Sequence, residues 1–153
     1  MFLDILVGVD GSPSARRALD TAAELAQAGN AKLTLVTVAP PVSSYVTLAG
    51  VDVGRMRSEL DRWASELLEK ASATMPDGVI AHTVQRAGEA GPEIVKELEQ
   101  GSYDLLVLGS RGRGRTQSGL LGSVNGYVHF HTHIPVLTIP DDGETVGLDE
   151  PDA

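Results

Sequence analysis

The stretch Ile5-Leu6-Val7-Gly8-Val9-Asp10-Gly11-Ser12-Pro13 contains a buried strand, a polar turn and the start of a helix. The strand is almost continuously apolar and rich in branched side chains, which is typical of a strand covered on both faces. Ser12 and Pro13 are typical of a helix N-cap and of the first helical position. A strand that leads through a short turn into a helix predicts an α/β fold built on a parallel sheet.

The same alternation of strand and helix continues along the chain. We expect five strands, at residues 2–9, 32–38, 79–86, 104–108 and 135–139, the third of them polar enough for a sheet edge. Helices are expected at about 13–29, 55–75, 91–99 and 119–130, with a long loop over 39–54. Strands joined by crossover helices predict one doubly wound domain, a five-stranded parallel sheet with helices on both faces. This domain covers residues 1–140, and the acidic residues 141–153 are expected to be disordered.

The charge of the chain is acidic overall but positive in one place. The 153 residues carry a formal net charge of −9, which argues against nucleic acid or an anionic membrane as a partner. Residues 105–140 contain no Asp or Glu, whereas Arg111, Arg113 and Arg115 lie close together there. A positive island in an acidic chain predicts a small anionic ligand.

The sequence lacks the features of an exported or membrane-spanning protein. It contains no cysteine, and no apolar run approaches the ~20 residues that cross a bilayer. The first residues carry an acid and no basic segment, unlike a secretory signal. We therefore expect a cytoplasmic protein.

A glycine-rich segment between Gly109 and Ser123 carries the chemistry. Because glycine lets the backbone approach a ligand closely, successive main-chain N–H groups in such a loop can surround an anion. The helix that follows adds its N-terminal N–H groups, and Ser123 can donate its hydroxyl to a phosphate oxygen. The alternative is an ordinary loop with solvated arginines. The segment matches neither the Walker phosphate loop nor the dinucleotide fingerprint.

The spacing of this segment resembles the universal stress proteins, whose nucleotide-binding members carry Gly-x2-Gly-x9-Gly-Ser/Thr. Gly109, Gly112, Gly122 and Ser123 match that pattern. Residues 5–12, 104–110 and 134–137 also resemble the family's conserved blocks in the same order. The resemblance implies a sheet with strand order 3-2-1-4-5 and a nucleotide lying across the tips of strands one and four.

The resemblance also implies a role for each position. The nucleotide would be adenine-based: ATP, or alternatively ADP, AMP or cyclic AMP, with Mg²⁺ bound through the phosphates. Asn125 stands where the family often has Ser or Thr, and its amide is expected to donate to the terminal phosphate. The implied binding residues are Gly8 and Asp10 for ribose and adenine, Val38 for the adenine edge, Leu108 and Gly109 for sugar and α-phosphate, and Gly112, Gly122, Ser123 and Val124 for the phosphates, to which the local charge adds Arg111. Taken alone, Asp10 also suits a turn and Val38 a core position.

These observations favour a regulatory, nucleotide-binding stress-response protein over a metabolic enzyme. The first alternative is a slow ATPase, or an enzyme that phosphorylates itself at Ser110, Thr116, Ser118 or Ser123. The second is a nucleotide-free dimeric scaffold. Whether the protein binds a nucleotide or is only a scaffold, we expect the apolar strand Pro135–Ile139 to pair with a second copy, because sheet edges invite pairing.

Three other features are given a structural interpretation. The tract His129, His131 and His133 straddles an expected helix end and is interpreted as a capping feature rather than a metal site. Trp63 is interpreted as a core or interface residue. Glu89, Glu93 and Glu97 are expected on the solvated face of a short helix.

Overall fold

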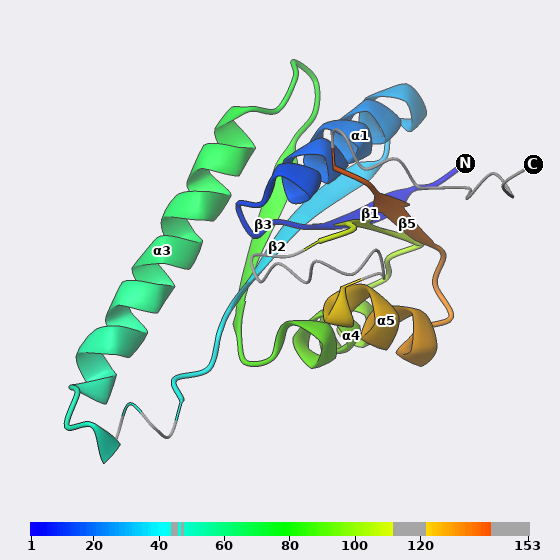
Figure 1. The fold of residues 1–153 in the computed structure, drawn as a ribbon. Helices are drawn as coiled ribbons and strands as arrows, with labels where there is room; N and C mark the ends of the chain where they lie inside the picture. Colours follow the sequence, from blue (N-terminus) through cyan, green and yellow to red (C-terminus); the bar gives the residue numbers. More distant parts are fainter. Residues whose placement is uncertain (44–45, 47, 112–121, 142–153) are drawn as a thin grey trace, which may run out of the picture.

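A five-stranded parallel sheet in the order β3-β2-β1-β4-β5 forms the centre of the protein (Figure 1). The structure is a computed structural model that describes residues 1–43, 46, 48–111 and 122–141. Both the predicted sheet and its order are confirmed, with the polar third strand at an edge. The strands are β1 (Asp4–Gly8), β2 (Lys32–Ala39), β3 (Ala81–Ala87), β4 (Leu105–Gly109) and β5 (Val136–Ile139).

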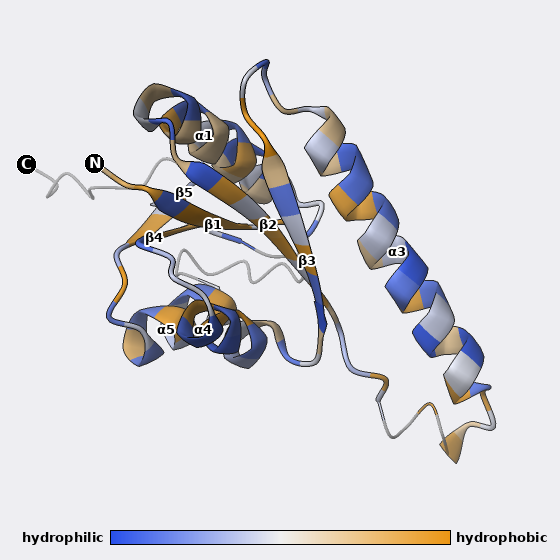
Figure 2. Cartoon of the chain, turned by 180° about the vertical axis from the view of Figure 1, so that it is seen from behind, coloured by the Kyte–Doolittle hydropathy of each residue, from blue (hydrophilic) through white to orange (hydrophobic). Residues whose placement is uncertain are grey.

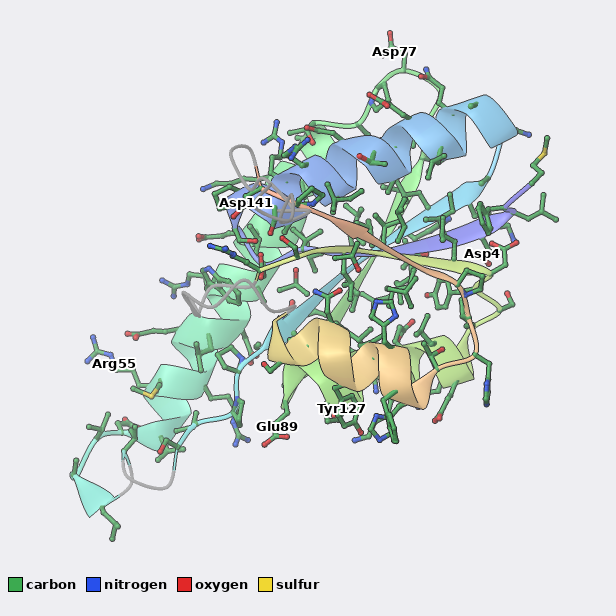
Figure 3. The ribbon with its side chains drawn as sticks, turned by 45° about the vertical axis from the view of Figure 1, so that its right-hand side comes forward. Asp4, Arg55, Asp77, Glu89, Tyr127 and Asp141 are labelled. Atoms are coloured by element: carbon green, nitrogen blue, oxygen red, sulfur yellow. The ribbon has the colours of Figure 1, made fainter. Side chains whose placement is uncertain are left out.

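Helices cover both faces of the sheet, as expected (Figures 1 and 2). α1 (Pro13–Gly29) and α3 (Val53–Ala73) lie on one face, and α4 (Ala90–Gln100) and α5 (Ser123–His131) on the other. Figure 3 shows Tyr127 of α5 and Glu89 at the start of α4 on one side of the sheet, with Asp77 beyond α1 on the other. No helix within the described ranges is both long and apolar enough to cross a membrane.

The two faces hold two separate apolar cores. In β1, Ile5 and Val7 pack in the core under α1 and α3, whereas Leu6 packs in the core under α4 and α5. All three side chains are fully buried. Because successive side chains of a strand point to opposite faces, a strand covered on both sides must be apolar at every position, which explains its uninterrupted apolar run.

Two helices, α3 and α5, begin two or more residues away from their expected first residues, whereas α1 has its expected bounds. α1 ends at Gly29 as expected, and its C-cap residue Asn30 adopts the left-handed conformation at φ 50°. α3 begins at Val53, because the side chain of Asp52 accepts a hydrogen bond of 3.2 Å from the Arg55 N–H. α5 begins at Ser123 rather than at residue 119, since Gly122 already lies outside the helix.

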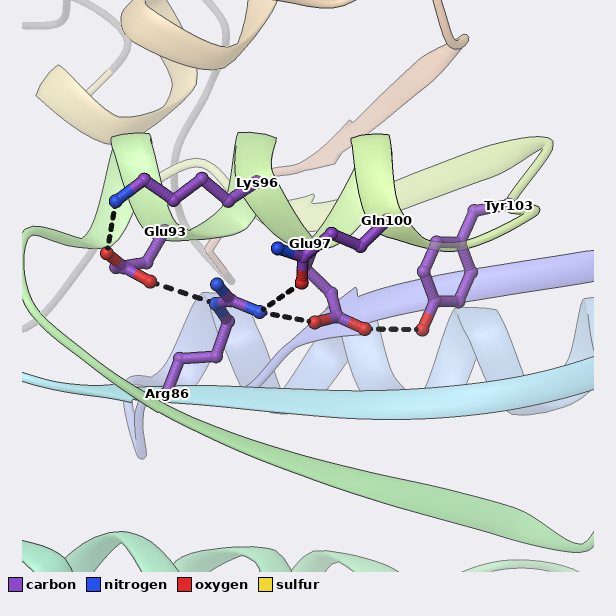
Figure 4. Close-up of polar contacts among 6 residues, drawn as sticks. All are labelled: Arg86, Glu93, Lys96, Glu97, Gln100 and Tyr103. Atoms are coloured by element: carbon purple, nitrogen blue, oxygen red, sulfur yellow. Dashed lines mark hydrogen bonds and ion pairs between the residues drawn. The ribbon is translucent and has the colours of Figure 1, made fainter.

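A network of charged side chains ties α4 to the edge strand β3 (Figure 4). Arg86 Nε donates to Glu93 Oε2 at 2.9 Å, and Arg86 Nη1 donates to Glu97 Oε2 at 2.8 Å. The Tyr103 hydroxyl donates to the other oxygen of Glu97, and burial followed by this contact raises the pKa of Tyr103 to about 12. The prediction that Glu93 and Glu97 lie on a solvated face is therefore wrong: the two carboxylates are 14% and 12% exposed and face the sheet.

The network predicts a stability contribution that disappears in acid. Hydrogen bonds from Lys96 and Arg86 lower the pKa of Glu93 below its ordinary value. A lowered carboxyl pKa stabilises the folded state above the unfolded pKa, and this contribution is lost as the pH falls through the folded value. We expect Glu93→Gln to cost about 1 kcal/mol at neutral pH, and the difference from wild type to vanish toward about pH 3.

Urea denaturation of both proteins at several pH values measures this difference. Glu59→Gln is the matched control, because Glu59 pairs with Arg55 on the surface, where the two side chains are 63% and 80% exposed, and no measurable cost is expected. A Glu93→Gln difference that persists unchanged in acid would contradict the expected linkage.

Candidate functional site

A cavity of about 320 Å³ lies at the carboxyl ends of β1, β2 and β4. This volume falls in the range of roughly 300–1,000 Å³ that is usual for small-ligand sites. The carboxyl ends of parallel strands meet at one edge of the sheet, and the point where strand order reverses, here between β1 and β4, leaves a crevice there. Residues from all four long helices also line the cavity.

The cavity brings together the site residues that were predicted from the sequence. They come from the ends of three strands and from the first turn of α5. Gly112 lies outside the described residues, as do Arg113, Arg115, Thr116 and Ser118. The predicted residues that line the cavity are Gly8, Asp10, Val38, Leu108, Gly109, Arg111, Gly122, Ser123, Val124 and Asn125.

The first turn of α5 opens onto the cavity without a side-chain cap. Its N-cap residue is Gly122, which has no oxygen to offer to the N–H groups of the first turn. The Gly122 N–H donates to Ser110 O at 3.2 Å, which holds the start of the helix against the end of β4. An uncapped helix terminus combines main-chain donors with the positive end of the helix dipole, and it therefore favours an anion.

The end of β4 is joined to the start of α1 by two serines. The hydroxyls of Ser14 and Ser12 donate to the carbonyl of Arg111 at 2.7 and 3.1 Å. Ser14 is fully buried and also accepts from the Arg111 N–H at 3.3 Å. The backbone at Arg111 is therefore fixed beside the cavity, which its half-buried side chain lines.

Asp10 combines the two roles that the sequence left open. Its Oδ1 accepts from the Ser12 N–H at 2.9 Å, an Asx-turn contact that shapes the connection from β1 to α1. The same residue lines the cavity and is partly exposed. The turn thus orients a carboxylate toward the cavity.

Asn125 is held in the interior by both ends of its amide. Its Nδ2 donates to Gly109 O at 2.8 Å, its Oδ1 accepts from the Thr138 hydroxyl at 2.9 Å, and the residue is 3% exposed. The side chain thus links β4, α5 and β5. This geometry disfavours the expected amide contact with a terminal phosphate and leaves the main-chain N–H of Asn125 as its candidate donor.

The sequence analysis did not identify the apolar residues that line part of the cavity, here called its apolar half. It includes Trp63, which was expected in the core or an interface but is half-buried and lines the cavity. A stripe of apolar side chains on a helix shows which face is covered, but it does not show what covers each position. The lining residues that were missed are Val9, Ala15, Val36, Pro40, Trp63, Ala90 and Ile94.

The histidine tract has local partners. His131 Nδ1 lies 2.8 Å from Tyr127 O one turn earlier, and its ring stacks on that of Tyr127 at 3.9 Å between centroids. His129 Nε2 lies 3.4 Å from Thr138 Oγ1. Within the part of the chain that the structure describes, no three His, Asp or Glu side chains gather as metal ligands would.

Comparison with known proteins relates this sequence and fold to one family. The model of the Universal stress protein family matches residues 1–140. Universal stress protein YxiE of Bacillus subtilis is 31% identical over 147 residues, covering 91% of this chain and 99% of that protein. Relatives in Mycobacterium tuberculosis and Mycobacterium bovis are 33% identical over 92% of this chain, which spans 49% of their length. A universal stress protein in complex with cAMP, 28% identical, matches in structure with a TM-score of 0.58 over 90% of this chain and 96% of that one.

Proposed function

Because the chain belongs to the universal stress protein family, we propose that it binds an adenine nucleotide in the cavity at the strand ends and acts as a regulatory stress-response protein. The observation that carries this proposal is the make-up of the cavity. Its lining combines the uncapped start of α5 and the cationic Arg111 with apolar side chains and with Asp10. These parts suit phosphate, base and ribose in that order.

The proposed pose follows from those parts. The phosphates lie at the first turn of α5, where main-chain N–H groups and the Ser123 hydroxyl donate to them. Arg111 supplies the positive charge, and Gly112 contributes to the same cradle. The ribose hydroxyls donate to Asp10 beside Gly8, and the base lies along the end of β2 at Val38.

Mg²⁺ enters this site with the nucleotide. Asp10 is the only carboxylate among the described residues that line the cavity, and one of its oxygens already accepts from Ser12. A Mg²⁺ ion brought by ADP or ATP is therefore held chiefly by phosphate oxygens and water, which is common for this ion. The same scarcity of carboxylates leaves no evident base to orient an attacking water, so any ATP hydrolysis is slow.

Titration calorimetry with ATP, ADP, AMP and cyclic AMP tests the proposal directly. We expect at least one of the four to bind with a dissociation constant well below millimolar. Phosphate release from ATP over hours then separates a binding protein from a slow ATPase. An absence of binding heat with all four nucleotides at millimolar concentration would overturn the proposal and leave the dimeric scaffold.

We also propose that two copies of the chain associate through β5. This strand lies at the edge of the sheet, pairs with β4, and has Leu137 37% exposed. An edge strand presents main-chain donors and acceptors to a second strand. Sedimentation velocity of the purified chain measures the association, and a monomer mass at every concentration would contradict it.

A further inference from the structure

The apolar half of the cavity is built by segments that lie far apart in the sequence. Val38 and Pro40 come from the end of β2, Ala90 and Ile94 from α4, and Trp63 from the middle of α3. Neighbouring positions of the same half are well packed, since Val36 is 1% and Ile94 is 5% exposed. Trp63 lines the same cavity and is only half-buried.

Packing of α3 places Trp63 next to the turn that carries Asp10. A β-carbon built on Gly11 would lie 3.7 Å from Leu67 Cδ1, so Leu67 sits against that turn. Trp63 is one helical turn before Leu67 on the same face of α3. It therefore lies one helical turn from the side chain that contacts the turn after Asp10, and it lines the same cavity as Asp10.

The segment of α3 around Trp63 is also held to the sheet. Gln85 Nε2 of β3 donates to the carbonyl of Asp61 at 3.0 Å, two residues before Trp63. Ala64, the residue after Trp63, is fully buried. Figure 1 shows α3 continuing in the N-terminal direction beyond the sheet. Trp63 therefore lines the cavity from a segment of α3 that a hydrogen bond holds to the sheet.

We propose that Trp63 stacks on the base of the bound nucleotide and makes the site selective for purines over pyrimidines. This inference rests on the nucleotide-binding function proposed above. An indole ring offers a flat apolar face of large area, and its stacking with a base strengthens as the shared area grows. A two-ring purine covers more of that face than a one-ring pyrimidine, whereas phosphate and ribose contacts are the same for both.

Tryptophan fluorescence gives the first test, because Trp63 is the only tryptophan of the chain. The probe is AMP, titrated into the full chain with excitation beyond the absorption of tyrosine. We expect the emission to change with a midpoint equal to the calorimetric dissociation constant. Calorimetric binding with unchanged emission overturns the inference but leaves the proposed function standing. Absence of binding heat overturns both.

Two substitutions of Trp63 give the second test, with AMP and CMP as paired ligands. Trp63→Leu keeps an apolar side chain but removes the flat ring, and we expect AMP affinity to fall about tenfold, with a smaller loss for CMP. Trp63→Phe keeps a ring, and we expect AMP affinity within about threefold of wild type. The decisive quantity is the ratio of the AMP and CMP affinities, which a purely structural role of Trp63 would leave unchanged.

The outcomes of this test separate cleanly. A lower AMP-to-CMP ratio in Trp63→Leu, restored in Trp63→Phe, supports stacking. A ratio equal to that of wild type in Trp63→Leu overturns it. Circular dichroism checks that each variant folds, and if Trp63→Leu does not, the fluorescence titration still decides.

Discussion

Gly122→Val is expected to weaken nucleotide binding by at least about 100-fold while the fold is retained, a loss of about 2.7 kcal/mol in binding free energy. Gly122 has φ −56° and ψ 159°, which any residue can adopt, and among the described residues a β-carbon there would meet only Ser110 O, at 3.4 Å. The added side chain therefore fits the folded protein. It stands, however, beside the N–H groups of the first turn of α5, where the phosphates are proposed to lie.

Calorimetry with AMP and ATP measures the loss of affinity, and thermal unfolding checks the fold. Valine is a poorer N-cap than glycine, so a cost in stability of about 0.5–1 kcal/mol is expected. Gly126→Val is the matched control: it adds the same side chain four residues later, where a β-carbon meets no atom of the described part of the chain within 4 Å. Equal affinities in Gly122→Val and wild type would mean that the phosphates lie elsewhere.

Gly109→Ala is expected to act on the fold itself and to lower the free energy of unfolding by about 3 kcal/mol. A β-carbon on Gly109 would lie 2.5 Å from both Ala15 N and Ser14 Oγ, distances that no packed structure tolerates. The atoms in the way belong to the backbone and a fully buried side chain of the first turn of α1. Moving them breaks the bonds from Ser12 and Ser14 to the carbonyl of Arg111.

Urea and thermal denaturation measure this cost, which corresponds to a fall in Tm of about 10 °C for a chain of this size. Gly126→Ala is the control, because it adds one methyl group to an open position of α5 and should stabilise the helix by up to about 1 kcal/mol. Wild-type stability of Gly109→Ala would show that α1 can move away from β4 without cost, and the close packing inferred at this point would be wrong.

Much of the architecture could be predicted because its signals are local. The apolar run of β1 reports burial on both faces, and Ser12 with Pro13 reports a helix start within two residues. The glycine spacing from Gly109 to Gly122 led to the cavity, which contains every predicted site residue that the structure describes. Strand order came from the family resemblance, since the order of parallel strands is not encoded in any short segment.

The contacts that could not be predicted involve side chains whose partners lie elsewhere in the chain. Asn125 was expected to face a phosphate, but its amide bonds to Gly109 and Thr138. Glu93 and Glu97 were expected in solvent, but both form ion pairs with Arg86 of β3 and are largely buried. Polar side chains are buried where partners satisfy them, and those partners are set by the packing of distant elements.

For this protein, residue patterns alone predicted the α/β class, the approximate bounds of most elements, and a segment suited to an anion. Those properties depend on burial period, capping and backbone freedom, each of which acts over a few neighbouring residues. Only the folded structure showed the apolar half of the cavity with Trp63, the buried amide of Asn125 and the charge network of α4. Each of these depends on which atoms meet across the sheet, and that is determined by long-range packing rather than by any one stretch of sequence.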